Sequence, residues 1–170
     1  ILLGQSLGTN RILFYQAETA DSRVRGLVLM AAPGNLLEWN IRIFGPGRAL
    51  SVLAEAQRWI REGRGADLML VDLGPLGKAL YSANHVVSLR GPNTRSDPFQ
   101  NIARVRVPIL IFHGKEDRLA DPAVAEGLKA AAVAAPSVQL YMISGAEHGL
   151  GERVDDILPI LGPWLEAVSK

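Results

Sequence analysis

Three short segments of this sequence carry residue types that together could activate a hydroxyl group. Ser6 is the centre of GQSLG, Asp117 ends GKED, and His148 ends GAEH. A serine hydroxyl is a weak nucleophile until an imidazole accepts its proton, and a carboxylate on the other ring nitrogen fixes the imidazole tautomer. The three residues are therefore the candidate nucleophile, acid and base of one site.

The residues around Ser6 predict a strand, a sharp turn and a helix. Residues 1–3 are apolar, and the segment from Thr9 to Ala20 contains neither Gly nor Pro. A serine at the apex of such a turn is held in a strained backbone conformation with its hydroxyl exposed. Gly4 and Gly8 are expected to leave room for the strand and the helix to approach each other.

Three further segments are predicted to be strands buried in a sheet. They are apolar runs bounded by turn residues and cover residues 26–32, 109–114 and 137–144. Runs without alternation are typical of parallel strands covered on both faces. The predicted fold class is therefore α/β, with a mostly parallel sheet flanked by helices. Helices are expected from Asp121-Pro122 to about 135 and over about 153–168, where Pro159 and Pro163 predict a kink or a late start.

The predicted strands bring the three candidate residues to one edge of the sheet. Asp117 follows the strand at 109–114, and His148 follows the strand at 137–144. In open parallel α/β sheets, ligands bind outside the carboxyl ends of the strands. Ser6, Asp117 and His148 should therefore converge there.

Other residues of the same types are less well placed. Of the three histidines, His85 lies in an irregular region, and His113 lies within a predicted strand as a partly buried, hydrogen-bonded residue. Glu116 competes weakly with Asp117. Asp121 is better explained as a helix cap, and Glu147 is expected to point away from the site.

These motifs resemble those of the α/β-hydrolase superfamily. GQSLG resembles its nucleophile elbow, GKED its acid loop and GAEH its histidine loop, and the order Ser, Asp, His is the order of that fold. The resemblance implies a carboxylesterase-like or lipase-like serine hydrolase that cleaves an ester or related acyl bond through an acyl-Ser6 intermediate. The backbone N–H of Leu7, at the start of the helix, is the expected oxyanion donor. Serine at the elbow argues against the dehalogenase and epoxide-hydrolase branches.

The resemblance also divides the chain. Residues 1–34 and 102–170 would form the α/β core, and 35–101 a helical cap that shapes the substrate pocket, with peripheral connecting helices as the alternative. Helices are predicted over 49–62, 66–72 and 76–82. Aromatic and Met side chains of this region could line an acyl pocket or form the core of the cap: Trp39, Phe44, Trp59, Met69 and Tyr81.

The chain opens with Ile1, so it resembles the C-terminal half of the fold. We expect earlier strands and a second oxyanion donor to precede Ile1. An unpaired edge at the first strand would favour self-association.

Composition narrows the remaining possibilities. The 170 residues have a formal net charge of +1 and contain no cysteine. The charge balance predicts no nucleic-acid partner, the apolar runs are too short for a membrane span, and the histidines lack metal-ligand spacing, so neither a metal nor a cofactor is expected. The absence of cysteine fits a cytoplasmic location. A small apolar acyl compound is the expected substrate.

Alternatives from the same residues are an acyltransferase, a thioesterase or a carbon–carbon bond hydrolase with the same triad. A truncated, non-catalytic hydrolase scaffold that acts as a binding module is a further alternative, as is a flavodoxin-like cofactor binder.

Overall fold

The polypeptide leaves one folded unit after Gly34 and returns to it at Asp97. The computed structural model describes residues 1–74 and 77–169. Its first unit consists of Ile1–Gly34 and Asp97–Lys170, and its second unit is Asn35–Ser96. The second unit is thus an insertion between two parts of the first.

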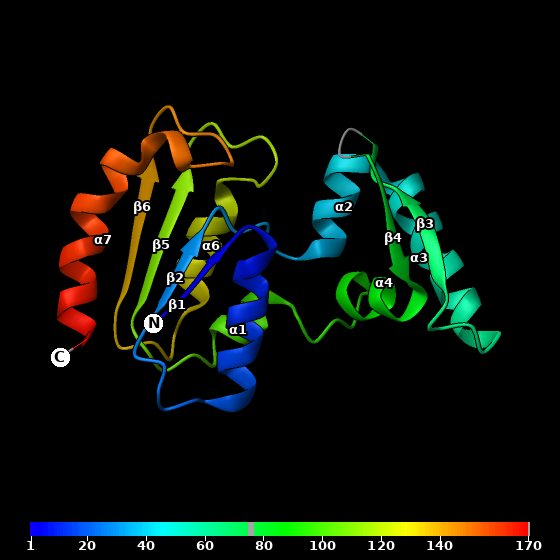
Figure 1. The fold of residues 1–170 in the computed structure, drawn as a ribbon, viewed down its shortest axis with the longest axis horizontal. Helices are drawn as coiled ribbons and strands as arrows, with labels where there is room; N and C mark the ends of the chain where they lie inside the picture. Colours follow the sequence, from blue (N-terminus) through cyan, green and yellow to red (C-terminus); the bar gives the residue numbers. More distant parts are fainter. Residues whose placement is uncertain (75–76, 170) are drawn as a thin grey trace. The chain divides into compact units, whose positions relative to one another are not determined.

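Four parallel strands form the sheet of the first unit (Figure 1). In chain order they are β1 (Leu2–Gln5), β2 (Leu27–Met30), β5 (Ile109–Gly114) and β6 (Val138–Ile143). Their order in the sheet is β1-β2-β5-β6, so β1 and β6 are the two outer strands. The predicted α/β fold with a mostly parallel sheet is confirmed, and each predicted strand is present.

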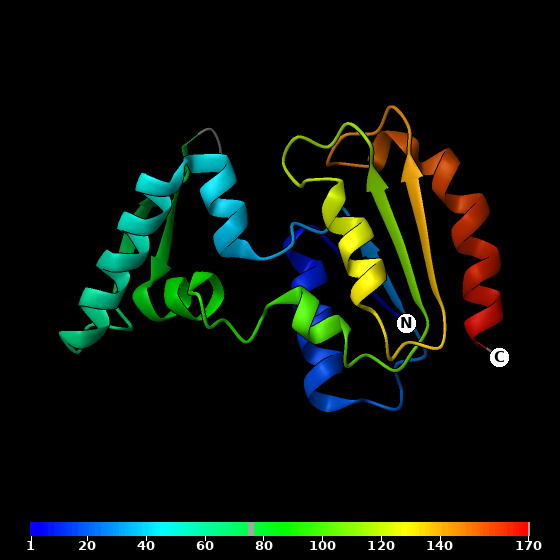
Figure 2. The same ribbon diagram turned by 180° about the vertical axis from the view of Figure 1, so that it is seen from behind.

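Helices cover both faces of this sheet. Figure 2 shows α1 (Leu7–Thr19), α5 (Pro98–Ile102) and α6 (Ala123–Ala131) on one face, with α7 (Val154–Ser169) on the other. Leu29 and Ile111 lie in the core beneath α1 and α6, while Val28 and Leu110 lie in the core that includes Trp164 of α7. Alternate residues of β2 and β5 are therefore buried on opposite faces, which explains their continuous apolar sequences.

Two predicted helices of the first unit differ in detail from the structure. The helix α6 ends at Ala131, short of residue 135. The helix α7 begins at Val154 and contains both Pro159 and Pro163, so of the two predicted alternatives, a kink or a late start, the late start is wrong. Each proline removes one N–H donor from the helix, but the buried side chains of Ile157 and Trp164, one on each side of Pro159 and Pro163, pack α7 against the sheet. Among the described residues, no helix is both long and apolar enough to cross a membrane.

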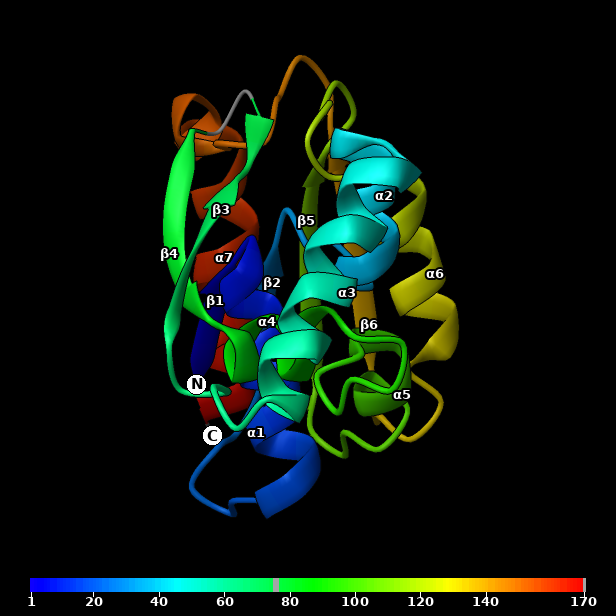
Figure 3. The ribbon, with the colours of Figure 1, turned by 90° about the vertical axis from the view of Figure 1, so that its right-hand side faces the viewer.

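The second unit contains three helices and a two-stranded hairpin among its described residues (Figure 3). The helices are α2 (Leu36–Phe44), α3 (Pro46–Arg61) and α4 (Ala83–Arg90), and the strands are β3 (Leu68–Asp72) and β4 (Lys78–Ser82). Helix α3 confirms the helix predicted over 49–62.

The helices predicted over 66–72 and 76–82 are wrong, because β3 and β4 pair there as antiparallel strands. Residue 76 lies outside the described residues. Met69 and Val71 are buried in the core of this unit, whereas Leu68 and Leu70 are each 63% exposed. The alternation is that of a strand with one covered face, but four consecutive apolar residues hide it in the sequence.

The outer position of β1 bears on the predicted self-association. Leu3 of β1 is 53% exposed. An outer strand offers unpaired backbone groups and this apolar side chain to a second strand. Self-association through β1 stays a prediction.

Candidate active site

Ser6 occupies the sharp turn between β1 and α1. Its φ of 51° and ψ of −126° lie outside the regions that L-residues prefer, at a cost of about 1–3 kcal/mol. The Ser6 N–H donates to Met30 O at 2.8 Å, and the Thr9 hydroxyl donates to Ser6 O at 2.7 Å. Hydrogen bonds to β2 and to the first turn of α1 therefore hold the strained residue in place.

The two glycines of GQSLG have different roles. A Cβ added to Gly4 would lie 2.6 Å from the backbone carbonyl carbon and oxygen of Gly8. A Cβ added to Gly8 would meet no described atom within 4 Å. The close approach of strand and helix thus requires the absence of a side chain at Gly4 alone.

Asp117 is held in the loop that follows β5. Asp117 is 4% exposed, and its Oδ1 accepts hydrogen bonds from the N–H groups of Leu119 (2.9 Å) and Ala120 (2.8 Å). Burial raises the pKa of Asp117, but interactions with His113, His148 and the Ala120 N–H outweigh burial and lower the pKa below its ordinary value. The carboxyl is consequently an anion at neutral pH.

His148 links this carboxylate to the serine. Its Nδ1 lies 2.8 Å from Asp117 Oδ2, and its Nε2 lies 2.9 Å from Ser6 Oγ. A carboxylate only accepts hydrogen bonds, so Nδ1 carries the proton and the lone pair of Nε2 faces the serine hydroxyl. The imidazole side chain is 22% exposed, whereas the Asp117 side chain is fully buried. The structure therefore brings together the three residues selected from the sequence.

Backbone contacts hold the His148 loop over the end of β5. A Cβ on Gly114 would lie 2.7 Å from Glu147 O, and the Glu116 N–H donates to Ala146 O at 3.1 Å. On the far side of the loop, Gln5 Nε2 donates to Gly149 O at 2.8 Å. The sequence patterns did not predict this role of Gln5, although a polar side chain that precedes Ser6 at the end of a strand is expected to lie near the same site.

The competing residues lie elsewhere or serve other purposes. Glu116 and Glu147 are exposed, and Asp121 Oδ1 accepts a hydrogen bond from Ala123 N at the start of α6. His85 belongs to α4 of the second unit, where its ring stacks on Tyr81 with centroids 5.0 Å apart.

His113 requires a correction. It is fully buried rather than partly buried, and among the described residues its Nδ1 has no hydrogen-bond partner. Its Nε2 lies 3.2 Å from Ala120 O and 3.4 Å from Asp117 Oδ2. No local pattern in the sequence marks the burial of His113 or its approach to Asp117.

Leu7 is the first residue of α1. The first four N–H groups of a helix have no partner within the helix, and the helix dipole favours negative charge beside them. The role of the Leu7 N–H as an oxyanion donor remains a prediction.

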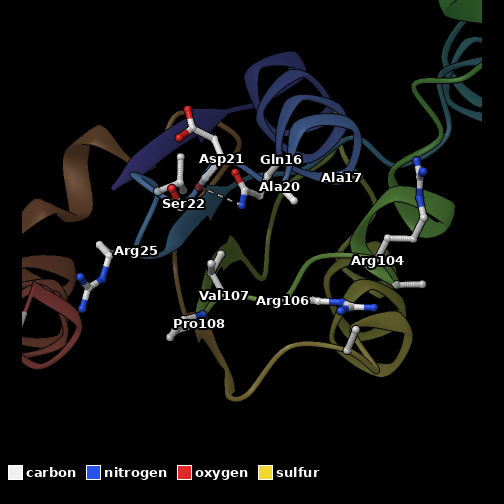
Figure 4. A pocket seen from close by; sticks show the side chains of 13 residues that line it. Gln16, Ala17, Ala20, Asp21, Ser22, Arg25, Arg104, Arg106, Val107 and Pro108 are labelled. Atoms are coloured by element: carbon white, nitrogen blue, oxygen red, sulfur yellow. Dashed lines mark hydrogen bonds between the residues drawn. The ribbon is translucent and has the colours of Figure 1, made fainter.

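A hollow of about 830 Å³ lies at the other end of the sheet (Figure 4). Its lining includes residues that precede β2 and β5, among them Val24, Arg25, Arg106 and Pro108. These are the amino ends of the strands, whereas Ser6, Asp117 and His148 follow carboxyl ends. The hollow is therefore separate from the three-residue site.

Comparison with known proteins identifies the fold. No family model and no curated protein matches the sequence. Three similar solved structures are a monoacylglycerol lipase from Paleococcus ferrophilus, the esterase domain of a Rhodothermus marinus protein, and the α/β-hydrolase enzyme MGS-MChE2 from a lagoon-sediment metagenome. The chain has the α/β-hydrolase fold that these structures share.

The extent of the similarity is as follows. The TM-scores are 0.66, 0.63 and 0.58, with sequence identities of 18%, 20% and 18%, in the order given above. The matches cover 98%, 96% and 100% of this chain, but 67%, 60% and 63% of the other chains. The chain therefore spans 60% to 67% of the length of these structures.

Proposed function

We propose that this chain carries the catalytic triad of a serine hydrolase that cleaves a carboxylic ester or related acyl bond. The observation that carries the proposal is the pair of hydrogen bonds joining Ser6 Oγ to His148 Nε2 at 2.9 Å and His148 Nδ1 to Asp117 Oδ2 at 2.8 Å. This arrangement is the one that nucleophilic catalysis by serine requires. The α/β-hydrolase fold supports it.

In the acylation step, Ser6 Oγ bonds to the acyl carbon while its proton passes to His148 Nε2. Asp117, an anion at neutral pH, stabilises the resulting imidazolium through Nδ1. The tetrahedral intermediate collapses when the bond from the acyl carbon to the leaving group breaks, and His148 donates its proton to the departing alcohol. The product is an ester of Ser6.

In the deacylation step, water attacks the acyl-Ser6 carbon and gives a proton to His148. The intermediate then releases the carboxylic acid, and His148 returns the proton to Ser6 Oγ. In both steps the oxyanion would accept a hydrogen bond from the Leu7 N–H at the start of α1. A second donor would come from outside the segments around Ser6, Asp117 and His148.

The second unit is proposed as the helical cap of this hydrolase. The chain departs for this unit just after the carboxyl end of β2, which is the edge of the sheet where Ser6 and Asp117 lie. Insertions at this edge commonly carry binding and lid functions in α/β proteins. A small apolar acyl compound is the proposed substrate class, and the similar structures include a monoacylglycerol lipase and an esterase domain.

A fluorophosphonate probe tests the proposal directly, because it reacts only with an activated serine. Intact-mass analysis should show one adduct on the wild-type chain and on Ser22→Ala, which removes an exposed serine of the same unit. The Ser6→Ala variant should show none. A folded wild-type chain without an adduct would refute the hydrolase proposal and favour the non-catalytic scaffold.

Substrate profiling then separates the remaining activities. Esters of graded acyl length should be hydrolysed, with loss of activity in Ser6→Ala. Faster turnover of thioesters, transfer of the acyl group to an added alcohol, or cleavage of a 1,5-diketone would instead assign the triad to a thioesterase, an acyltransferase or a carbon–carbon bond hydrolase.

A further inference from the structure

His113 lies directly beside the candidate triad without being part of it. It is the penultimate residue of β5 and is fully buried. Its Nε2 lies 3.4 Å from Asp117 Oδ2. The same Oδ2 receives the Nδ1 of His148 at 2.8 Å. Two imidazoles therefore approach one carboxylate oxygen, and only the imidazole of His148 also reaches Ser6.

The surroundings of His113 determine where its proton lies. Its Nε2 faces two oxygens that only accept hydrogen bonds, Ala120 O at 3.2 Å and Asp117 Oδ2, so Nε2 must carry a hydrogen. Its Nδ1 is buried without a partner among the described residues. A second N–H there would be an unsatisfied buried donor on a charged ring, which is costly. The ring is therefore neutral, with its single hydrogen on Nε2.

The acid is thus surrounded by donors on both sides. Asp117 Oδ1 accepts from the N–H groups of Leu119 and Ala120, while Oδ2 faces the N–H of His148 and that of His113. These two histidines are the ionisable groups that contribute most to lowering the pKa of Asp117, one from β5 and one from the loop after β6. Of these four N–H groups, those of His113 and His148 approach Oδ2. Without His113, only His148 would remain beside this oxygen.

We propose that His113 is a positioning residue that holds the Asp117 carboxylate, through its neutral Nε2–H, in the orientation that His148 requires. This role rests on the proposed function of the triad. His113 Nε2 lies 3.2 Å from Ala120 O, its hydrogen-bond partner, and 3.4 Å from Asp117 Oδ2, close enough for the N–H dipole to attract the carboxylate towards the backbone of its own loop. His113 has no path to the substrate, because the ring is fully buried and its one N–H already faces these two oxygens.

The first test uses NMR and does not depend on activity. Two-bond ¹H–¹⁵N spectra of the ¹⁵N-labelled Ser6→Ala chain near neutral pH should show one histidine with a protonated Nε2 and an unprotonated Nδ1. The loss of its signals in His113→Gln assigns them to His113. The downfield proton of His148 Nδ1 should be sharp, should broaden or vanish in His113→Leu, and should return in His113→Gln. A cationic His113, or one protonated on Nδ1, would overturn the proposal.

The second test measures the rate of Ser6 phosphonylation against pH. His113→Leu should slow labelling about 10-fold, because the carboxylate loses the N–H dipole that lies 3.4 Å from its charged oxygen. It should also move the acid limb of the profile to higher pH, because a less compensated Asp117 charge holds the proton on His148 more tightly. His113→Gln keeps an N–H donor and should recover most of the lost rate.

Phe112→Leu is the matched control. Phe112 is also fully buried in β5 but packs on the opposite face, in the core with Leu110 and Trp164. It should lower the melting temperature without moving the acid limb. If His113→Leu behaves like Phe112→Leu, or is labelled like the wild type, the positioning role is wrong.

Failure of the proposed function has a different signature. A wild-type chain that is not labelled at Ser6 refutes the hydrolase proposal, and the NMR test on Ser6→Ala still decides the state of His113. The opposite case combines two results: the wild type is labelled at Ser6, and the His148 Nδ1 proton signal is unchanged in His113→Leu. These results refute the role of His113 and leave the hydrolase proposal intact.

Discussion

Replacing Gly4 by Ala should damage the site more than the same replacement four residues later. The added Cβ would lie 2.6 Å from Gly8 C and O and 2.8 Å from Thr9 N. Ordinary van der Waals contact begins near 3.4 Å, and all three atoms belong to the backbone. Because no side chain can rotate away, β1 and the first turn of α1 must separate by about 0.8 Å.

The separation has two expected consequences. Forcing extra atoms into a packed region costs about 1–3 kcal/mol, and each kcal/mol lowers the melting temperature of a domain this size by about 2–4 °C. Ser6 lies inside the displaced turn, and its Oγ is 2.9 Å from His148 Nε2. A displacement of about 1 Å at a reacting group costs about 100-fold in rate. Gly4→Ala should therefore lose both stability and phosphonylation rate.

Gly8→Ala is the matched control, because it makes the same chemical change within helix α1. No described atom lies within 4 Å of the added Cβ. Alanine is favoured over glycine in a helix by about 0.5–1 kcal/mol, so this variant should be as stable as the wild type or more stable. Thermal unfolding by circular dichroism and the rate of fluorophosphonate labelling measure both effects.

Equal losses in the two variants would refute the reasoning, as would a Gly4→Ala chain with wild-type stability. Loss of stability in Gly4→Ala without loss of labelling would show that the turn moves as a unit with His148, and would refute the link between this glycine and the geometry of Ser6.

Two further predictions concern stability. The folded-state pKa of Asp117 lies below its ordinary value of 3.8, so its ionised form stabilises the fold above that value, and this stabilisation is lost as pH falls below it. Asp117→Asn should therefore be less stable at pH 7 by about 1–3 kcal/mol, and in urea unfolding the difference should shrink progressively as pH falls below 3.8; a constant difference would contradict this. At the end of α1, Ala20 has a left-handed backbone (φ 45°, ψ 42°), so Ala20→Gly should stabilise the chain by about 0.5–1 kcal/mol in urea unfolding. Ala17→Gly, within α1, should destabilise it by a similar amount; the same sign for both variants would contradict the assignment of the helix end.

The strands could be predicted because strands that are buried on both faces consist of consecutive apolar residues. Residues 27–30 and 109–112 alternate between the cores on the two faces of the sheet, so each of these positions selects an apolar side chain. The candidate site could be predicted for a related reason. Parallel strands direct their carboxyl ends to one edge, so residues that follow different strands, such as Asp117 and His148, are brought near each other without further information.

The remaining features depend on contacts that a local pattern does not encode. Met69 and Val71 are distinguished from Leu68 and Leu70 only by what packs against the hairpin, and all four are apolar. The full burial of His113 likewise depends on the loop that folds back over it through Ala120. A single residue in a strand carries no sign of such a cover in its own sequence.

The order of the strands explains why the His148 loop has its particular contacts. β1 and β6 are separated by β2 and β5, which places them about 14 Å apart at a spacing of about 4.8 Å per strand. His148 follows β6, yet its Nε2 contacts Ser6 at the end of β1. The loop must therefore cross the carboxyl ends of the two central strands.

The contacts of this loop occur in the order that such a crossing requires. It leaves β6, lies against Gly114 at the end of β5, and reaches β1, where Gln5 Nε2 donates to Gly149 O. A side chain at position 114 would lift the loop off the sheet, because its Cβ would lie 2.7 Å from Glu147 O. Gly114 therefore serves the base rather than the acid whose motif it begins. Gly114 and Asp117 of GKED act in the same site, because the loop that carries His148 must lie against Gly114 for His148 to reach Asp117.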